Sequence, residues 1–426
     1  MTDDNDFSRR KFIHTSAITG GVALFISSFP WLKCLADDKS GKEKRHLKVA
    51  FIGTGDRGFT LMANMLCFSK NDNISIVAVC DNYEPNLKRA VAYLNGEGNA
   101  YSDYRELFDK EQLDGVVIAT PPTSHADPAI EALSRGINVF CEKAWARALS
   151  ETKRMWDAYQ ASGKILQIGH QRMFDPKYLK TYQMIKDGAI GEITHMHAYW
   201  HRHGNWRRPV PEGHPELERK INWCLYKELS AGLHTEFETH QVHVANWFLD
   251  SAPIQVMGAG GINYYKNTER EVDDNISVIF TYPNGAHLIY DSINSNKHYG
   301  LEEKFMGPGG AIEVEQNRIY YENARGASSI EKLINDIENS VFDMVPIGGA
   351  TWIPETAEKA RGEVIYPRWK SEETMLQLQA FAGFIRNGGF PAEFTRQTYY
   401  ATVWSLLAEQ SIDENRILTL PEEYKI

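Results

Sequence analysis

Residues 47–58 read LKVAFIGTGDRG, and this stretch decides the fold of the chain. Val49 to Ile52 form a continuous apolar run, which is typical of a parallel strand covered on both faces. Gly53, Gly55 and Gly58 then fit the pattern G-x-G-x-x-G, whose glycines permit a tight turn, close approach of backbone to a pyrophosphate and close packing of the next helix. The stretch therefore predicts a strand, a glycine turn and a helix whose N-terminus faces phosphates.

The chain continues to alternate strands with helices as far as residue 168. A second apolar run, 74–80, ends at Asp81, which lies 23 residues after Gly58, close to the roughly 20 expected for the acid that binds the adenosine ribose. Further strands are predicted at 115–120, 137–140 and 165–168. Residues 47–168 thus predict a doubly wound α/β domain, an NAD(P)-binding Rossmann domain. The alternative is an α/β domain whose glycines serve only turns.

Length and composition limit the possible classes of protein. At 426 residues the chain is too long for one ordinary core, so two domains are expected. Contents of 42% hydrophobic and 12% aromatic residues are those of a globular protein. A formal charge of −10 argues against nucleic-acid or anionic-membrane partners. The five cysteines show no paired spacing, so neither a disulfide framework nor a CxxC metal site is predicted.

The first 36 residues are expected to lie outside the fold. Residues 8–13 read SRRKFI, a twin-arginine signature, and an apolar segment follows from Ala17 to Leu35. Gly20, Gly21 and Pro30 interrupt that segment, so no membrane span is expected in the mature chain. Residues 1–36 therefore predict a twin-arginine signal peptide and a periplasmic protein. The alternative is a disordered basic N-terminus.

From Gly169 onward the pattern changes. Two apolar runs, 275–282 and 286–293, flank Pro283-Asn284-Gly285, a hairpin signal. Helices are predicted at 176–187, 233–249, 374–386 and 397–411. We expect residues 169–426 to form a substrate-binding α+β domain with a large, mostly antiparallel open sheet. The stretch 322–371 shows weak periodicity, and no role is predicted for it.

The order and spacing of several short motifs resemble the Gfo/Idh/MocA family of oxidoreductases, named for glucose–fructose oxidoreductase, inositol dehydrogenase and a rhizopine catabolism protein. The motifs are the glycine turn, Thr120-Pro121-Pro122 with His125, Cys141-Glu142-Lys143, His170-Gln171-Arg172, and a helix with Glu236 and His240. The resemblance implies a tightly held NAD, and Asp81 favours it over NADP because a carboxylate repels a 2′-phosphate. The implied cofactor-binding residues are Gly53, Gly55, Arg57, Gly58, Asp81, Thr120, Pro121, His125, Glu142, Lys143, Gln171 and Arg172.

The resemblance also implies catalytic roles for Lys143, Glu236 and His240. The family's Glu-Lys-Pro stands here as Glu142-Lys143-Ala144, without the proline. A lysine at the end of a buried strand beside a nicotinamide cation is expected to have a lowered pKa, which would make it an acid or base near neutral pH. The alternative is a mere surface charge.

The helix that carries His240 supports a more detailed hypothesis. Glu236, His240 and His243 stand at i, i+4 and i+7 and share one face of a helix, so Glu236 could orient His240 while it handles the proton of a sugar hydroxyl. The same trio, with two H-x-H pairs at 195–197 and 201–203, is also a plausible set of metal ligands. No metal is predicted, because the resemblance already explains His240.

Aromatic and basic residues beyond the nucleotide domain predict a carbohydrate substrate. Flat rings stack on sugar C–H faces while polar groups bind hydroxyls. The predicted substrate-binding residues are Arg172, Trp206, Arg207, Tyr226, His240 and His243. The predicted function is hydride transfer between NAD(P) and a sugar or glycoside carbon. The alternatives are an NAD-dependent glycosidase with no net redox change and a catalytically silent sugar-binding protein, and a dimer or tetramer is expected from the resemblance.

Overall fold

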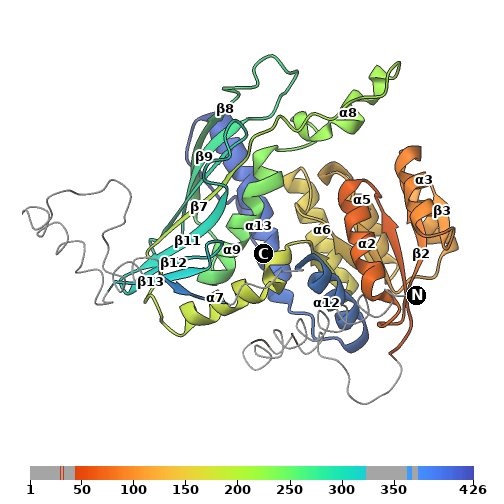
Figure 1. Cartoon of the computed structure of the whole chain (residues 1–426), viewed down its shortest axis with the longest axis horizontal. Helices are drawn as coiled ribbons and strands as arrows, with labels where there is room; N and C mark the ends of the chain where they lie inside the picture. Colours follow the sequence, from red (N-terminus) through yellow and green to blue (C-terminus); the bar gives the residue numbers. More distant parts are fainter. Residues whose placement is uncertain (1–28, 30–31, 33–43, 323–361, 367–372) are drawn as a thin grey trace, which may run out of the picture.

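The computed structural model describes residues 29, 32, 44–322, 362–366 and 373–426. Figure 1 shows a sheet with its covering helices on the right and a large sheet with helices on its inner side on the left. The predicted leader, residues 1–36, and the stretch 322–371 lie almost wholly outside the described residues. Phe29 and Leu32 are described and buried, and the ring of Phe29 lies 5.5 Å from that of Tyr182.

The N-terminal sheet has six parallel strands in the order β3-β2-β1-β4-β5-β6. The strands are β1 (Leu47–Ile52), β2 (Ile74–Cys80), β3 (Asn99–Tyr101), β4 (Gly115–Ile118), β5 (Asn138–Cys141) and β6 (Leu166–Ile168). The helices are α2 (Asp56–Ser69), α3 (Glu84–Tyr93), α4 (Tyr104–Lys110), η2 (Pro122–Ser124), α5 (Ala126–Ser134) and α6 (Leu149–Ser162). The connections diverge between β1 and β4, so a ligand crevice is expected at the carboxyl ends of these strands. The predicted Rossmann domain is confirmed, and β3 adds to the predicted strands.

The central strand β1 is buried on both faces, as its apolar run predicted. Val49 and Phe51 pack into the core beneath α2, whereas Ala50 and Ile52 belong to the core on the opposite face. This alternation follows from the two-residue repeat of a strand. Helices on both sides of the sheet are therefore required by the sequence of β1 itself.

The second sheet has nine strands in the order β14-β13-β12-β11-β7-β10-β9-β8-β15. They are β7 (His195–His201), β8 (Gln255–Gly261), β9 (Asn275–Thr281), β10 (His287–Ile293), β11 (Leu301–Gly307), β12 (Gly310–Glu313), β13 (Arg318–Tyr321), β14 (Glu363–Val364) and β15 (Leu418–Thr419). Strands β7 and β10 run parallel, and the other neighbouring pairs are antiparallel. The predicted mostly antiparallel sheet is confirmed.

The remaining helices cover this sheet and return to the first domain. They are η3 (Gln171–Phe174), α7 (Pro176–Lys186), η4 (Pro215–Leu217), α8 (Glu218–Ile221), η5 (Trp223–Leu225), the π-helix η6 (His234–Glu238), α9 (Thr239–Leu249), α12 (Glu373–Asn387), α13 (Ala392–Glu414) and η7 (Glu422–Tyr424). Helix α13 packs against α9 and β8, whereas α12 packs against α2 of the nucleotide domain. The predicted single helix 233–249 is therefore a π-helix followed by an α-helix.

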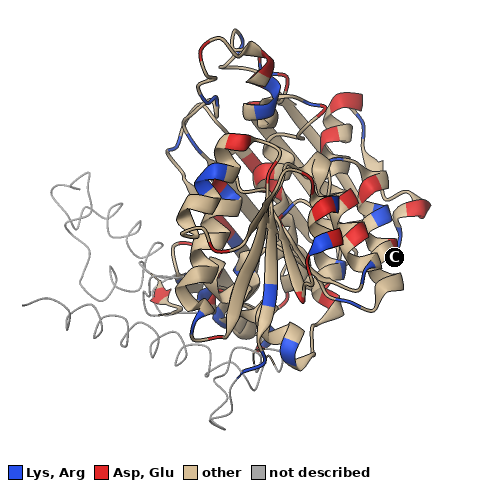
Figure 2. Ribbon diagram, turned by 90° about the vertical axis from the view of Figure 1, so that its right-hand side faces the viewer, with Lys and Arg blue, Asp and Glu red and all other residues tan. Residues whose placement is uncertain are grey.

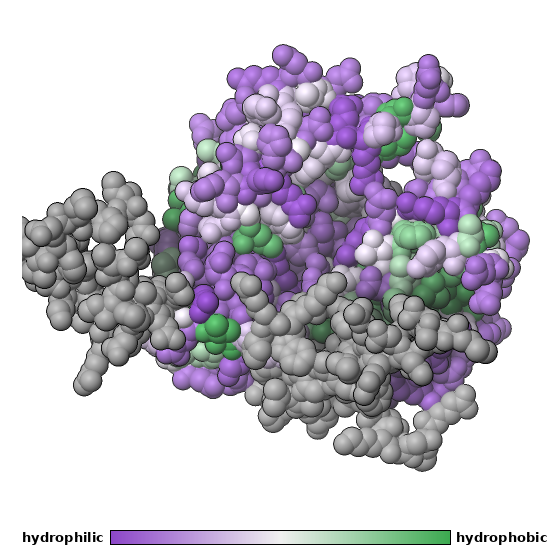
Figure 3. Space-filling view, in the orientation of Figure 1, coloured by the Kyte–Doolittle hydropathy of each residue, from purple (hydrophilic) through white to green (hydrophobic). Residues whose placement is uncertain are grey.

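The face of the molecule seen in Figure 3 is predominantly polar where described residues form it. Figure 2 shows acidic and basic residues interspersed along the helices, and Figure 3 shows hydrophobic residues as scattered patches on a largely hydrophilic face. Among the described residues, each helix is too short or too polar to cross a membrane.

The contact between α12 and the nucleotide domain gives a test of the fold. Phe381 of α12 is fully buried, and its ring centroid lies 5.9 Å from that of Phe140 in β5. We expect Phe381→Ala to lower the free energy of unfolding by about 3–5 kcal/mol, because it leaves a cavity between the domains. Urea unfolding measures this effect. Ile254→Ala, at a side chain that is 49% exposed, is the control and should change stability by less than about 0.5 kcal/mol; equal effects of the two changes would contradict this packing.

Candidate functional site

A cleft at the carboxyl ends of the nucleotide-domain strands is the candidate site. Its volume is about 760 Å³, within the roughly 300–1,000 Å³ usual for small-molecule sites. The predicted site residues that line it are Gly53, Gly55, Arg57, Asp81, Thr120, Pro121, Glu142, Lys143 and Glu236. The others lie away from this lining: Gly58, His125, Gln171, Arg172, Trp206, Arg207, Tyr226, His240 and His243. The binding and catalytic roles of both groups stay predictions.

The glycine turn at one wall of the cleft fits the diphosphate of a dinucleotide. Gly53 has φ +84°, and a Cβ there would lie 2.7 Å from backbone atoms of Ala119. A Cβ at Gly58 would lie 1.9 Å from the carbonyl oxygen of Gly53, so the turn and helix α2 pack too closely for any side chain. At Gly55, by contrast, a Cβ would meet only Asn86 among the described residues, at 3.6 Å. The open space above Gly55 can therefore receive a phosphate group at the N-terminus of α2.

Asp81 at the end of β2 lines the cleft and also holds the glycine turn. Its carboxylate accepts hydrogen bonds from the backbone N–H of Thr54 at 2.8 Å and from the Thr54 hydroxyl at 3.2 Å. The backbone N–H of Tyr83 donates to the same carboxylate at 2.8 Å. The residue predicted to bind the ribose thus also fixes the loop that would bind the phosphates.

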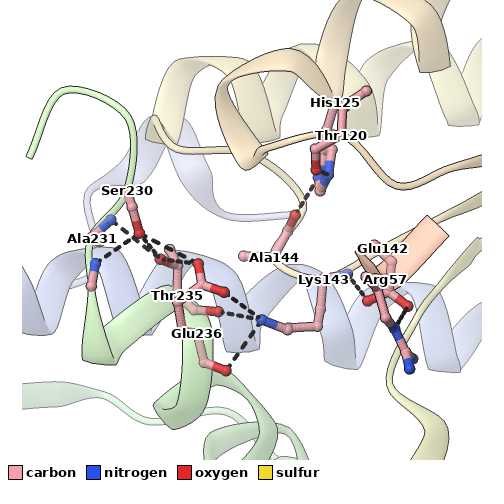
Figure 4. A network of polar contacts seen from close by, with 11 residues as sticks. Arg57, Thr120, His125, Glu142, Lys143, Ala144, Ser230, Ala231, Thr235 and Glu236 are labelled. Carbon is pink, nitrogen blue, oxygen red and sulfur yellow. Dashed lines mark hydrogen bonds and ion pairs between the residues drawn. The ribbon is translucent and has the colours of Figure 1, made fainter. Parts of the chain in front are cut away.

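Lys143 joins the two domains at the inner end of the cleft. Its ammonium group donates to the carbonyl oxygens of Thr235 and Glu236, each at 3.1 Å, and to the Glu236 carboxylate at 3.2 Å. Figure 4 shows these three oxygens converging on the lysine nitrogen. An ammonium group has three N–H donors, and all three have acceptors here. The peptide bond from Lys143 to Ala144 is cis, although the family's proline is missing.

The residues around Lys143 alternate in charge. Arg57 donates from Nε to the Glu142 carboxylate at 2.7 Å, and Glu142 is buried beside Lys143, which pairs with Glu236. The carboxylate of Glu236 is also within 3.4 Å of the Ser230 hydroxyl and 3.3 Å of the Thr235 hydroxyl. The helical spacing suggested that Glu236 orients His240. In the structure, the Glu236 carboxylate instead contacts Lys143 and two hydroxyls. The π-helix η6 accounts for the difference, because its wider turn changes which side chains share a face.

His125 is a fully buried residue that connects two loops of the nucleotide domain. Its ring nitrogens lie 2.8 Å from the carbonyl oxygen of Ala144 and 2.7 Å from that of Thr120. Figure 4 shows the ring between these two segments. His125 thus positions the loop after Lys143 against the loop after β4, and its predicted contact with the cofactor stays a prediction.

His240 lies beside two further buried histidines. Its ring centroid is 5.4 Å from that of His170, which is 4.5 Å from that of His243. Burial, followed by the positive charges of Arg172 and Lys143, holds the pKa of His240 well below its ordinary value of 6.5. The ring nitrogens of His170 and His243 have no hydrogen-bond partner among the described residues. Burial also lowers the pKa of His170 and of His243, so the three imidazoles are neutral near pH 7.

The predicted substrate contacts Arg172, Arg207 and Tyr226 are held in internal networks. Arg172 is buried in an ion pair with Glu303. Burial alone would lower the pKa of its guanidinium, but the Glu303 carboxylate outweighs this effect and raises the pKa above its ordinary value. Arg207 pairs with Glu218 and also donates to the carbonyl oxygen of Thr268, and the Tyr226 hydroxyl donates to Glu218 at 2.7 Å.

Trp206 has φ +64° and packs edge-on against Phe237, with ring centroids 5.2 Å apart. Phe237 in turn stacks on Trp200, with ring centroids 4.4 Å apart. The ring centroid of Trp200 lies 5.8 Å from that of His240.

Among the described residues, no group of three His, Cys, Asp or Glu side chains is arranged to hold a metal ion. On β7, His197 and His201 instead contact the carboxylate of Asp291.

Two cations that line the cleft were missing from the sequence prediction. Arg208 and Lys220 come from the second domain and reach residues of the nucleotide domain. They lie in a polar stretch without periodicity or a recognisable motif, so no local signal marks them. Tyr83, Ser102, Asp103, Tyr104 and Arg105 also line the cleft, at its Asp81 end.

The Rossmann sheet, the glycine cradle and the second domain define a two-domain dinucleotide-binding protein. The profile of the oxidoreductase family with an NAD-binding Rossmann fold matches residues 47–170, and that of the GFO/IDH/MocA C-terminal domain matches residues 178–313. Together the two profiles span more than half of the chain. The chain therefore belongs to the Gfo/Idh/MocA oxidoreductase family, as the motifs indicated.

Known members of the family differ in activity. The chain is 26% identical over 270 residues to a 2,7-anhydro-N-acetylneuraminate hydratase of Mediterraneibacter gnavus, covering 62% of this chain and 66% of the relative. It is 29% identical over 205 residues to an inositol 2-dehydrogenase of Salmonella typhimurium, covering 48% of this chain and 55% of the relative. It is also 28% identical over 322 residues to a glycosyl hydrolase family 109 protein of Shewanella baltica, covering 68% of each.

Solved structures share the fold. A myo-inositol 2-dehydrogenase from Lactobacillus plantarum superimposes with a TM-score of 0.65 at 19% identity, over 88% of this chain and 100% of that one. A levoglucosan dehydrogenase in complex with NADH and levoglucosan gives a TM-score of 0.67 at 17% identity, over 89% and 100%.

The buried histidines predict how stability depends on pH. Burial and the charge of Arg172 lower the pKa of His243 from 6.5 to about 3. Below pH 6.5 the unfolded chain binds a proton that the native chain does not bind, so the contribution of His243 falls as the pH falls towards 3. Between pH 7 and pH 5, His243→Asn should lose about 2 kcal/mol less unfolding free energy than the wild type, at about 1.4 kcal/mol per pH unit.

Urea unfolding at the two pH values measures this difference. The control is His287→Asn, at an exposed histidine on β10, which should keep the pH dependence of the wild type. If His243→Asn and the wild type lose equal stability between pH 7 and pH 5, His243 is not a buried neutral imidazole.

Proposed function

We propose that the protein is an NAD-dependent oxidoreductase that transfers hydride between a tightly held nicotinamide cofactor and a hydroxyl-bearing carbon of a sugar or glycoside. One observation carries the proposal. His240 is held neutral by burial and by nearby cations, and one of these cations, Lys143, pairs with Glu236 in the lining of the cleft. A neutral imidazole near this pair can accept the proton of a substrate hydroxyl.

NAD, when bound, supplies the acceptor for the hydride. The residues of the chain supply the other requirements of alcohol oxidation. His240 accepts the hydroxyl proton, and the resulting imidazolium can release it to solvent or return it in the reverse direction. The Lys143 ammonium, whose charge acts on His240, stabilises the negative charge that develops on the substrate oxygen as the hydroxyl proton leaves. The contacts of Lys143 with the Glu236 carboxylate and with two carbonyl oxygens of η6 hold the lysine and η6 together.

A carbohydrate substrate is supported by the surroundings of His240 and by the relatives. Trp200, Phe237 and Trp206 form a connected set of rings beside His240. Such rings suit the C–H face of a sugar or cyclic polyol. Relatives named as inositol dehydrogenases, and a structural relative that holds levoglucosan, act on or bind compounds of this kind. Export by the twin-arginine route, which carries folded proteins, completes the proposal and places the protein in the periplasm with its cofactor already bound.

A glycosidase is the second candidate function, favoured by the similarity to the glycosyl hydrolase family 109 protein and to the hydratase. In this reaction the C3 hydroxyl is oxidised and the C2 proton becomes acidic. Elimination then expels the aglycone, water adds, and the ketone is reduced again. The reaction has no net redox change, so it needs no supply of free NAD outside the cytoplasm.

The first prediction concerns the cofactor and the product. Protein denatured after purification should release close to one NAD(H) per chain, measured by chromatography and an enzymatic assay for NAD and NADP. Incubation with glycosides should then give a ketosugar and NADH if the protein is a dehydrogenase. A released aglycone without NADH would identify the glycosidase. A chain that neither carries nor binds NAD(H) would contradict both and favour a silent sugar-binding protein.

The second prediction concerns His240. His240→Asn should lower kcat by at least about 100-fold, the usual effect of losing a general base, and should leave the bound NAD(H) at the wild-type level. Steady-state kinetics and cofactor content measure the two effects. His287→Asn, on the exposed side of the second sheet, is the control. Full activity of His240→Asn would exclude His240 as the proton acceptor.

A further inference from the structure

Residues 202–223 form a segment of the second domain that reaches the nucleotide domain. The segment follows β7 and contains α8, which Figure 1 shows at the top, extending from the large sheet towards the nucleotide domain. Arg208 lies 3.2 Å from the carboxylate of Asp56 in the first turn of α2. Lys220 donates to the carbonyl oxygen of Asn82 at 2.8 Å and lies 5.6 Å from the ring centre of Tyr83.

The two cations are held in place by contacts within their own segment. The Asn222 side chain accepts from the backbone N–H of Arg208 at 2.7 Å and donates to its carbonyl oxygen at 3.1 Å. Asn222 is fully buried, so it ties the two halves of the segment together. Glu218 reinforces the tie, because it accepts from Arg207, Tyr226 and Asn222. Arg208 and Lys220 are therefore presented together by one braced loop.

The charges beneath Arg208 indicate what it binds. Asp56 stands in the first turn of α2, beside Gly55, where the carboxylate would repel a diphosphate. Arg89 lies 3.3 Å from this carboxylate, and Arg208 approaches its other oxygen. Arg57 of the same turn is engaged with Glu142. The second domain thus supplies a cation at the place where the cofactor's phosphates need one, and both Arg208 and Lys220 line the cleft.

We propose that residues 202–223 are a strap that encloses the dinucleotide, with Arg208 binding the diphosphate and Lys220 fastening the strap over the adenosine side at Asn82 and Tyr83. The inference rests on the proposed function, because it assumes that the cleft holds NAD. It goes beyond that function by assigning cofactor retention to two residues of the substrate domain. Release of the cofactor then requires the strap to leave the nucleotide domain.

The rate of NADH release tests the strap. The double variant Arg208→Ala/Lys220→Ala should release NADH at least about tenfold faster than the wild type, since charge-assisted contacts to phosphate are among the stronger hydrogen bonds. Stopped-flow fluorescence during displacement of NADH by excess NAD measures the rate. Added salt should speed release from the wild type more than from the variant, because screening weakens partly exposed ion pairs.

The matched control is Lys227→Ala/Arg396→Ala, which removes the same charge from positions outside the strap. Lys227 pairs with Asp413 and Arg396 with Glu393, both within the second domain. This control should release NADH at the wild-type rate. The conservative variant Arg208→Lys/Lys220→Arg should restore part of the slow release, and thermal unfolding confirms that each variant is folded.

The outcomes separate this inference from the proposed function. If the wild type binds NADH and the double variant releases it no faster than the control, the strap is wrong while the proposed function stands. If the wild type binds neither NAD nor NADH, both are overturned. Faster release that is specific to the Arg208 and Lys220 variant supports the strap.

Discussion

The ammonium group of Lys143 is the contact on which the site depends, because it joins the end of a Rossmann strand to the π-helix of the other domain. Its three donors meet two main-chain carbonyls and one carboxylate of η6. A π-helix is a rare and less favourable conformation, found mainly where function or an external partner requires it. Here the partner is Lys143 of the nucleotide domain, which lies two residues after the end of β5. Phe237 lies in η6, and His240 lies in the helix that follows it directly. A lysine that is remote in sequence therefore helps to position the surroundings of the proposed base.

Lys143 also contributes to the neutral state of His240, after burial and the charge of Arg172. Glu142 is occupied by Arg57, and Glu236 is occupied by Lys143. The charged groups that act on His240 are then Arg172, Lys143 and Arg57, and they reinforce the effect of burial on its pKa. A carboxylate facing His240 would have favoured the imidazolium. Burial, together with these cations, therefore leaves a neutral base, a property that belongs to the surroundings of His240 rather than to any one residue.

Sequence reasoning predicted the structure correctly where the fold depends on short, local patterns. The apolar run and the glycines of residues 47–58 determine a strand, a turn and a helix, and the Rossmann domain follows from repeating that pattern. The antiparallel sheet was likewise indicated by its hairpin signal at Asn284-Gly285. The π-helix was missed because no local pattern marks it, and Lys143, which contacts two of its carbonyl oxygens, lies 92 and 93 residues away in the sequence. Arg208 and Lys220 were missed for the same reason, since their significance comes from Asp56 and Asn82 on the other domain.

Arg207 and Arg208 show why residue type alone could not assign the polar segment after β7. The two are neighbours with the same side chain, yet one is directed to Glu218 and the Thr268 carbonyl, and the other to Asp56 across the cleft. The first braces the loop, and the second uses that brace to reach the other domain. In a loop without this internal support, the entropic cost of ordering the chain on binding would offset much of the attraction between Arg208 and a phosphate. The contacts of Glu218 and Asn222 order the loop before any ligand binds, so this entropy is not lost on binding. Arg207, which was expected to contact the sugar, instead takes part in the contacts that hold Arg208 in position for the proposed cofactor.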